Sequence, residues 1–128
     1  MRLLLDTHVL IWALGDDQRL SERAREAIGD RENEILVSAV SATEVTTKYR
    51  LGKLPQTEQL AGSFLSIIRA ADYTPLPISV EHAASAGNLS IDHKDPFDRL
   101  LIAQAQLEDA LLVSNEKLFD GFGVNRLW

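Results

Sequence analysis

The opening stretch of the chain decides the fold, and it reads Met1-Arg2-Leu3-Leu4-Leu5-Asp6-Thr7-His8. Its three consecutive leucines form a short apolar run, which is typical of a strand buried on both faces of a parallel sheet. The run ends at the acid Asp6, and the pattern over residues 7–14 predicts a helix packed directly after the strand. A strand that passes straight into a helix is the repeating unit of α/β proteins.

The rest of the chain continues this alternation of strands and helices. Short apolar runs predict further strands at residues 34–37 and 111–113, a short strand within residues 74–78, and a last edge strand at 124–128. Helical patterns and caps predict helices at residues 21–28, 38–51, 56–70, 79–87 and 95–108. We therefore expect residues 1–128 to form one α/β domain, with a parallel sheet flanked by helices on both faces.

Composition excludes several classes of protein. The 128 residues include no cysteine, so disulfides, thiolate nucleophiles and cysteine-ligated metal centres are ruled out. No apolar run approaches the roughly 20 residues of a membrane span. The apolar run at the N-terminus has only three leucines before Asp6, which is too short for a signal peptide. We expect a soluble cytoplasmic protein.

The net charge argues against nucleic-acid binding unless the acids have a special task. Thirteen Lys and Arg against nineteen Asp and Glu leave a net charge of −6. Proteins that bind the phosphates of nucleic acids usually present a basic surface. Acids that crowd one pocket to hold divalent cations would inflate this negative count without repelling a phosphate substrate once metal is bound.

Four acids lie where such a pocket would form. Asp6 and Glu116 follow predicted strands, while Glu44 and Asp98 lie near the starts of predicted helices. Sites in open parallel sheets form beyond the carboxyl ends of the strands, so all four can converge there. Carboxylate oxygens suit Mg²⁺ or Mn²⁺, and such a centre can activate water for phosphodiester hydrolysis.

Each acid also has an ordinary structural explanation. Asp6 is a suitable helix N-cap, and Glu116 suits a surface acid at the start of a helical turn. Glu44 follows Ser41 by three residues, which is the spacing of a capping box, and precedes Lys48 by four, which favours a helical ion pair.

The segment Asp95-Pro96-Phe97-Asp98 leads into an apolar helix. Asp95 is a plausible N-cap, Pro96 suits the first helical position and Asp98 lies in the first turn. Residues 100–103 are apolar, so the helix should be buried on most sides and its start should open into a cleft. Two carboxylates there are unfavourable unless a cation or hydrogen-bond donors meet them.

These acids and their neighbours resemble the PIN-domain family, most closely its bacterial VapC-like toxin ribonucleases of type II toxin–antitoxin pairs. The likeness runs from Met1 to Trp128, and its most specific part is the segment from His93 to Ala105. The segments that carry it read Leu3-Leu4-Leu5-Asp6-Thr7-His8, Ser38-Ala39-Val40-Ser41-Ala42-Thr43-Glu44, Asp95-Pro96-Phe97-Asp98-Arg99 and Leu112-Val113-Ser114-Asn115-Glu116.

The resemblance implies a Rossmann-like sheet, a Mg²⁺ or Mn²⁺ site, hydrolysis of RNA, a homodimer and a small antitoxin protein that blocks the cleft. Residue by residue, it makes Asp6, Glu44 and Asp98 the core acids, while Glu116 stands where the family usually has Asp. Thr7 and Ser114 are candidates for supporting hydroxyls. Asp95 belongs to the motif, but capping is the better explanation of it.

Other candidate groups carry weaker signals. Lys48, Arg50 and Lys53 form a small basic group that suits either a solvated helix end or contacts to RNA phosphates. The three histidines lack the spacing of a helical zinc site, so we expect structural roles for them. No phosphate-binding glycine loop and no nucleophile elbow is present.

Two other functions stay open at this stage. The first is an aspartyl-phosphate hydrolase that uses Asp6 as its nucleophile, although His8 stands where such enzymes usually carry a second Asp. The second is a non-catalytic PIN-like binding module whose acids only cap helices. The preferred hypothesis is a divalent-metal-dependent endoribonuclease that acts as a toxin.

Overall fold

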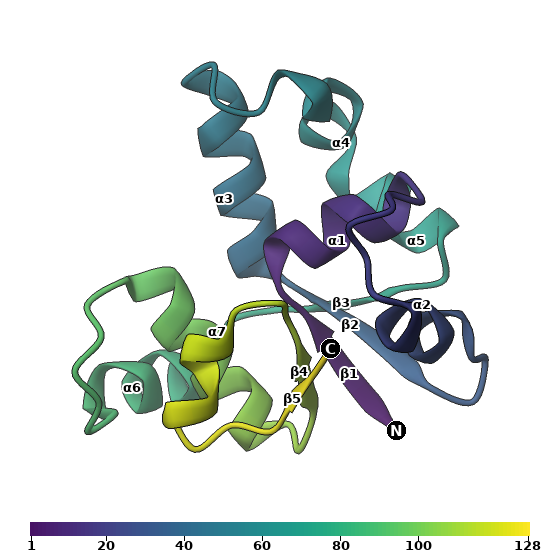
Figure 1. Cartoon of the computed structure of the whole chain (residues 1–128). Helices are drawn as coiled ribbons and strands as arrows, with labels where there is room; N and C mark the ends of the chain where they lie inside the picture. The colour runs from purple at the N-terminus through teal and green to yellow at the C-terminus, as the bar shows by residue number, and fades with distance from the viewer.

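The computed structural model describes the whole chain, residues 1–128, around a five-stranded sheet in the order β3-β2-β1-β4-β5 (Figure 1). Every neighbouring pair of strands runs parallel, which confirms the predicted α/β fold. The strands are β1 (Arg2–Leu5), β2 (Glu34–Ser38), β3 (Thr74–Leu76), β4 (Leu111–Val113) and β5 (Arg126–Leu127).

The predicted helices are present, with one correction. The helices are α1 (Thr7–Leu14), α2 (Glu22–Gly29), α3 (Ala39–Arg50), α4 (Glu58–Gly62), α5 (Phe64–Ala70), α6 (Val80–Asn88) and α7 (Pro96–Leu107), with 3₁₀ turns η1 (Pro55–Thr57) and η2 (Lys117–Gly121). The prediction of one helix over residues 56–70 is wrong. The chain breaks at Ser63, whose φ of −143° is not helical, directly after Gly62, a poor helix former.

The short strand predicted within residues 74–78 is β3, and the last predicted strand is shorter than expected. β3 ends at Leu76, immediately before Pro77, which has no N–H to extend the ladder. The last strand occupies only Arg126–Leu127, but it forms the predicted edge of the sheet beside β4.

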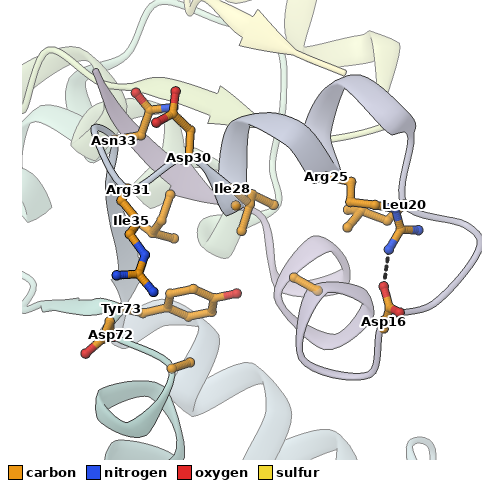
Figure 2. Close-up of a pocket in the computed structure, with 13 residues that line it drawn as sticks. Asp16, Leu20, Arg25, Ile28, Asp30, Arg31, Asn33, Ile35, Asp72 and Tyr73 are labelled. Atoms are coloured by element: carbon orange, nitrogen blue, oxygen red, sulfur yellow. Dashed lines mark hydrogen bonds and ion pairs between the residues drawn. The ribbon is translucent and has the colours of Figure 1, made fainter.

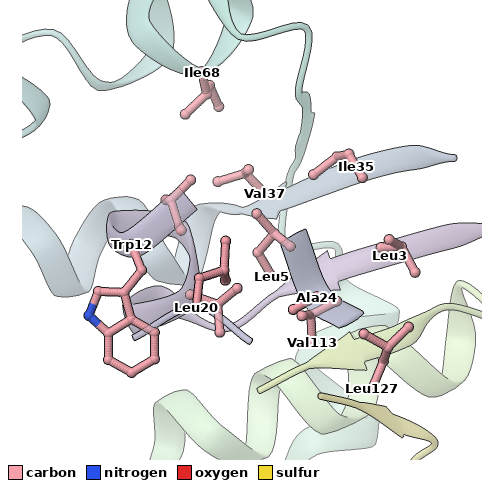
Figure 3. Packing of buried hydrophobic residues seen from close by; sticks show 12 residues of the cluster. Leu3, Leu5, Trp12, Leu20, Ala24, Ile35, Val37, Ile68, Val113 and Leu127 are labelled. Atoms are coloured by element: carbon pink, nitrogen blue, oxygen red, sulfur yellow. The ribbon is translucent and has the colours of Figure 1, made fainter. Parts of the chain in front are cut away.

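The sheet divides the apolar core into two layers, with β1 contributing to both. Leu3 and Leu5 face a cluster that includes residues of α1 and α2, and Figure 3 shows this layer. Leu4 faces the opposite layer, which includes residues of α3 and α7. Alternate side chains of a strand point to opposite faces, so three buried leucines in a row require helices on both sides.

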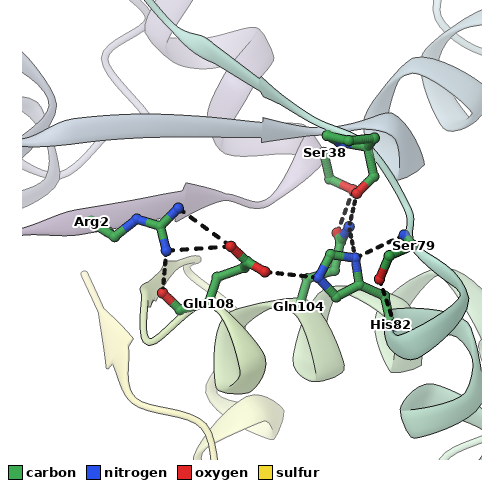
Figure 4. Close-up of polar contacts among 7 residues, drawn as sticks. Arg2, Ser38, Ser79, His82, Gln104 and Glu108 are labelled. Atoms are coloured by element: carbon green, nitrogen blue, oxygen red, sulfur yellow. Dashed lines mark hydrogen bonds and ion pairs between the residues drawn. The ribbon is translucent and has the colours of Figure 1, made fainter.

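One polar side chain lies fully buried on the apolar helix α7. The Ser38 hydroxyl donates to Gln104 Oε1 at 2.5 Å, and Gln104 Nε2 donates to the Pro77 carbonyl at 3.2 Å (Figure 4). Ser38 also begins α3, because its Oγ accepts the Val40 N–H at 3.0 Å. Gln104 therefore connects the end of β2 and the segment after β3 to α7.

His82 has the structural role expected from the sequence. Its Nδ1 accepts the Ser79 N–H at 3.0 Å, which completes a capping box at the start of α6, and its Nε2 contacts Glu108 Oε2 at 3.0 Å. Glu108 also contacts Arg2, whose guanidinium pairs in addition with Glu34. These neighbours, first the His82 hydrogen bond and then Arg2, lower the pKa of Glu108.

None of the helices is both long and apolar enough to cross a membrane.

We predict that Gln104→Met destabilises the fold more than a surface change on the same helix. Methionine fills a similar volume but leaves the Ser38 hydroxyl and the Pro77 carbonyl without their partner. Each unpaired buried polar group costs about 1–3 kcal/mol, so the free energy of unfolding should fall by about 2–4 kcal/mol in urea titrations. The control Gln106→Met also removes two hydrogen bonds, to the Phe122 and Gly123 carbonyls, but at an exposed position where water can replace them, so the free energy of unfolding should fall by less than about 1 kcal/mol. Equal effects of the two variants would contradict the role given to Gln104.

Candidate active site at the carboxyl edge of the sheet

The site is organised where the strand order reverses, between β1 and β4. Asp6 follows β1 and Ser114 follows β4, and the Ser114 hydroxyl donates to Asp6 Oδ2 at 2.8 Å. The Asp6 N–H also donates to the Val113 carbonyl at 3.0 Å. Open parallel sheets bind their ligands in the crevice at such a reversal.

Asp6 is both a helix cap and a buried charge. Its Oδ1 accepts the Thr7 N–H at 2.7 Å, so the capping explanation is correct, yet only 6% of the residue is exposed. Burial raises the pKa of Asp6, the Ser114 hydrogen bond offsets part of this rise, and the negative charge of Glu116 adds to it. The ionised carboxylate is thus held under electrostatic strain that a cation would relieve.

The backbone of Glu116 is linked to Asp6 through the Ser114 hydroxyl. Its N–H donates to the Ser114 hydroxyl at 3.1 Å, and the Ser114 carbonyl accepts Arg126 Nη1 at 2.9 Å. The Glu116 side chain makes no capping hydrogen bond to η2, although the residue stands in the N-cap position. The half-buried carboxylate therefore has no capping role, and the alternative of a surface acid at the start of η2 stays open.

Asp95 and Asp98 lie at the start of α7 and have different partners. Asp95 caps α7, since its Oδ1 accepts the N–H groups of Phe97 at 2.9 Å and Asp98 at 3.3 Å. Asp98 is half-buried, and burial raises its pKa; a hydrogen bond from His93 offsets part of the rise, and the charges of Asp95 and Asp6 add to it. The negative charge of Glu116 therefore acts on Asp6, and that of Asp6 acts on Asp98.

Glu44 lies on the neighbouring helix, and its surroundings differ from one expectation. The capping box of Ser41 and Glu44 is wrong, because α3 begins three residues earlier and is capped by Ser38. Ser41 Oγ instead lies 2.9 Å from Thr7 Oγ1, both buried, which joins the first turns of α3 and α1. The predicted ion pair is present, with Glu44 Oε2 2.6 Å from Lys48 Nζ.

The four acids do not form a closed metal cage. No three acidic or histidine side chains come close enough together to enclose one ion. The donor set still fits Mg²⁺ or Mn²⁺, since these ions prefer carboxylate oxygens and keep several waters. Burial raises the pKa values of Asp6 and Asp98, so a cation beside them would stabilise their ionised forms.

The sequence did not single out two further residues at this edge. His93 Nε2 lies 2.8 Å from Asp98 Oδ2, and Arg99 binds the backbone of the segment that carries His93. His93 was expected to be structural, and its spacing of five residues from Asp98 follows no helical or strand period. Only the motif that carries the family resemblance, which spans both residues, pointed to this segment.

The basic group extends away from the acids along α3. Lys48 is half-buried and forms an ion pair with Glu44, whereas Arg50 and Lys53 are exposed. At 1.5 Å of rise per residue, Arg50 lies about 9 Å beyond Glu44 along the helix axis.

A separate cavity lies at the opposite end of the sheet. It measures about 560 Å³ and is lined by residues before or at the start of β2 and β3, including Asn33, Ile35 and Tyr73, together with parts of α1 and α2 (Figure 2). Its charges are mixed, and none of the four acids lines it. The candidate site is therefore the acidic edge and not this cavity.

The PIN domain family model matches residues 3–124 of the chain. Ribonuclease VapC16 of Mycobacterium tuberculosis (strain ATCC 25618 / H37Rv) is 44% identical over 62 residues, which cover 48% of this chain and 43% of that protein. The match thus spans less than half the length of this curated relative.

Several solved structures share the fold over almost the whole chain. VapBC2 from Rickettsia felis, bound to a DNA fragment from their promoter, has a TM-score of 0.72 at 20% identity and covers 99% of this chain and 98% of its own. FitAcB from Neisseria gonorrhoeae has a TM-score of 0.68 at 18% identity, with coverage of 98% and 96%. Mycobacterium tuberculosis VapC20, described as a toxin that cleaves the sarcin-ricin loop, has a TM-score of 0.65 at 14% identity, with coverage of 95% of both chains.

We predict that Asp98→Asn raises the melting temperature of the metal-free protein at pH 7. A carboxyl whose pKa is higher in the folded than in the unfolded state stabilises the fold below its unfolded pKa, and that stability is lost as the pH rises through the folded pKa. Asparagine keeps an acceptor for His93 but does not ionise, so the variant does not lose this stability. Its melting temperature should therefore approach that of the wild type as the pH falls toward about 3.5.

The matched control is Asp95→Asn, because Asn caps a helix about as well as Asp. This variant should melt close to the wild type in metal-free buffer. An Asp98→Asn variant that melts below the wild type at pH 7 would contradict the electrostatic strain assigned to Asp98.

Proposed function

Because the chain belongs to the PIN domain family, we propose that it is a divalent-metal-dependent endoribonuclease and the toxin of a type II toxin–antitoxin pair. The observation that carries this proposal is the buried Asp6 at the strand reversal, whose carboxyl feels the charge of Glu116 and whose own charge acts on Asp98. The partial sequence match to a named ribonuclease supports the same activity.

In this proposal Asp6, Glu44 and Asp98 would hold the cation, and Glu116 would assist them from the segment after β4. A bound Mg²⁺ or Mn²⁺ lowers the pKa of a coordinated water and offsets negative charge on the phosphate oxygens. The chain's own contribution is orientation: Ser114 and Thr7 fix the Asp6 carboxylate, and the Ser114 hydroxyl also holds the Glu116 backbone.

The substrate is RNA, bound through its phosphates at the end of α3. Arg50 and Lys53 are exposed there, and Lys48 lies between them and the acids, beside Glu44. The acidic net charge of −6 is compatible with this role once cations neutralise the acidic edge.

A small antitoxin protein and a second copy of the chain complete the proposal. Among the solved structures with this fold is one titled as a toxin–antitoxin complex, from Klebsiella pneumoniae, with a TM-score of 0.63. By analogy, the antitoxin would cover the acidic edge, and the homodimer stays a prediction from the family resemblance.

The alternative of a non-catalytic binding module accounts for fewer observations. Capping explains Asp6 and Asp95. It does not explain Glu116, which makes no capping bond, or Asp98, whose carboxylate bonds to His93. The aspartyl-phosphate hydrolase fits less well, since the position two residues after Asp6 is His8 and not a second carboxylate.

We predict that Mn²⁺ raises the melting temperature of the wild type, and Mg²⁺ to a smaller extent, because ligands that bind only the native state stabilise it. Asp6→Asn should lose most of this response together with cleavage of single-stranded RNA, whereas Asp95→Asn should keep both. The measurements are thermal melting with and without metal and gel analysis of RNA cleavage with Mn²⁺. A calorimetric titration of the wild type without any Mn²⁺ binding would favour the non-catalytic module, and an unchanged Asp6→Asn response would remove Asp6 from the site.

We also predict that the double variant Arg50→Ala/Lys53→Ala weakens RNA binding without moving the cleavage positions. Each lost phosphate contact should lower the slope of log affinity against log salt by about 0.7 for single-stranded RNA. Fluorescence anisotropy in an Asp98→Asn background, which keeps the RNA intact, measures this slope. The control Arg23→Ala/Arg31→Ala removes the same amount of charge from exposed positions in and after α2. It should change the slope little. If Arg50→Ala/Lys53→Ala bound RNA with wild-type affinity at every salt concentration, the basic group at the end of α3 would be a solvated surface without contacts to RNA.

A further inference from the structure

The segment between α6 and α7 is held in place by one side chain, Arg99. A guanidinium group has five N–H donors in a fixed planar fork. Arg99 directs them to five backbone carbonyls, at Ala86 (3.0 Å), Gly87 (3.3 Å), Leu89 (2.7 Å), Ile91 (3.2 Å) and His93 (2.8 Å). A single side chain thus fixes the path of the backbone from the end of α6 to His93.

This path returns the His93 side chain to the start of α7. His93 Nε2 lies 2.8 Å from Asp98 Oδ2, and the His93 ring packs 5.2 Å from the ring of Phe122. Asp98 and Arg99 are consecutive residues in the first turns of α7. Arg99 therefore holds the loop whose histidine contacts the carboxylate next to it in sequence.

We propose that His93 is a positioning residue for the Asp98 carboxylate and that Arg99 acts on Asp98 through His93; this inference rests on the proposed metal-dependent function. Nε2–H donation to Oδ2 selects one orientation of the carboxylate and leaves Oδ1 with no protein hydrogen bond. An Asp on the first turn of a helix would otherwise sample several rotamers. Hydrogen bonds to a ligating group are typically worth about 10–100-fold in metal affinity.

The geometry separates this role from simple packing. The ring contact with Phe122 needs an aromatic side chain, whereas the contact with Asp98 needs a donor at the Nε2 position. His93→Phe keeps the ring and removes the donor, while His93→Gln loses the ring but carries an amide N–H at a similar distance from the backbone.

The test is calorimetric titration of Mn²⁺ into the purified chain without RNA, with metal-free melting as the check on folding. His93→Phe should bind Mn²⁺ at least tenfold more weakly than the wild type, and His93→Gln should recover most of the affinity. If His93→Phe does not fold, His93→Asn replaces it, because its amide is one methylene shorter than that of Gln and ends near the Nδ1 position instead.

Arg99 is tested by a double-mutant cycle. Lysine has three donors and cannot bind all five carbonyls, so Arg99→Lys should also weaken Mn²⁺ binding. If Arg99 acts through His93, the double variant Arg99→Lys/His93→Phe should bind Mn²⁺ no more weakly than His93→Phe alone.

The outcomes separate this inference from the proposed function. A wild type that binds no Mn²⁺ contradicts the metal site itself and the inference with it. A wild type that binds Mn²⁺ while His93→Phe binds equally well contradicts only the positioning role of His93. Additive losses in the double variant contradict the action of Arg99 through His93.

Discussion

A buried carboxylate at the centre of the sheet is the constraint to which the surrounding structure is adapted. Asp6 ends the central strand β1, caps α1 through the Thr7 N–H and accepts the hydroxyl of Ser114 from the end of β4. These two hydrogen bonds favour the ionised form, but burial outweighs them and raises the pKa of Asp6. Proteins commonly accept such local destabilisation at functional sites, where the stability lost is supplied by the rest of the fold.

The hydrogen bonds around Asp6 also connect elements that the sequence separates widely. Ser114 joins β1 to β4 and to the backbone of Glu116, and the contact of Thr7 with Ser41 joins α1 to α3. On the other side of the sheet, Gln104 joins the end of β2 to α7. The acidic edge is therefore assembled from several elements whose relative positions are fixed by buried polar contacts.

The sequence predicts the elements that depend on local signals. The leucines of β1, the apolar helix α7 and the cap at Asp95 each carry a pattern that survives in the structure. Local patterns failed where tertiary contacts decide between similar residues. Ser38 and Ser41 are equally good caps by type, and the contact of Ser41 with Thr7 leaves Ser38 as the cap. The partners of Arg99 are backbone carbonyls, which every residue has, so no pattern of side chains could reveal them.

The position of β1 has a consequence for synthesis of the chain. Asp6 and Ser114 are 108 residues apart, so at 5–20 residues per second roughly 5–20 s pass between their emergence from the ribosome. Residues 2–76 contain the adjacent strands β3, β2 and β1, which can pair early in this interval, before Asp98 and Glu116 emerge. Under the proposed function, a partly translated chain therefore cannot cleave the RNA that surrounds it, and activity begins only when β4 closes beside β1.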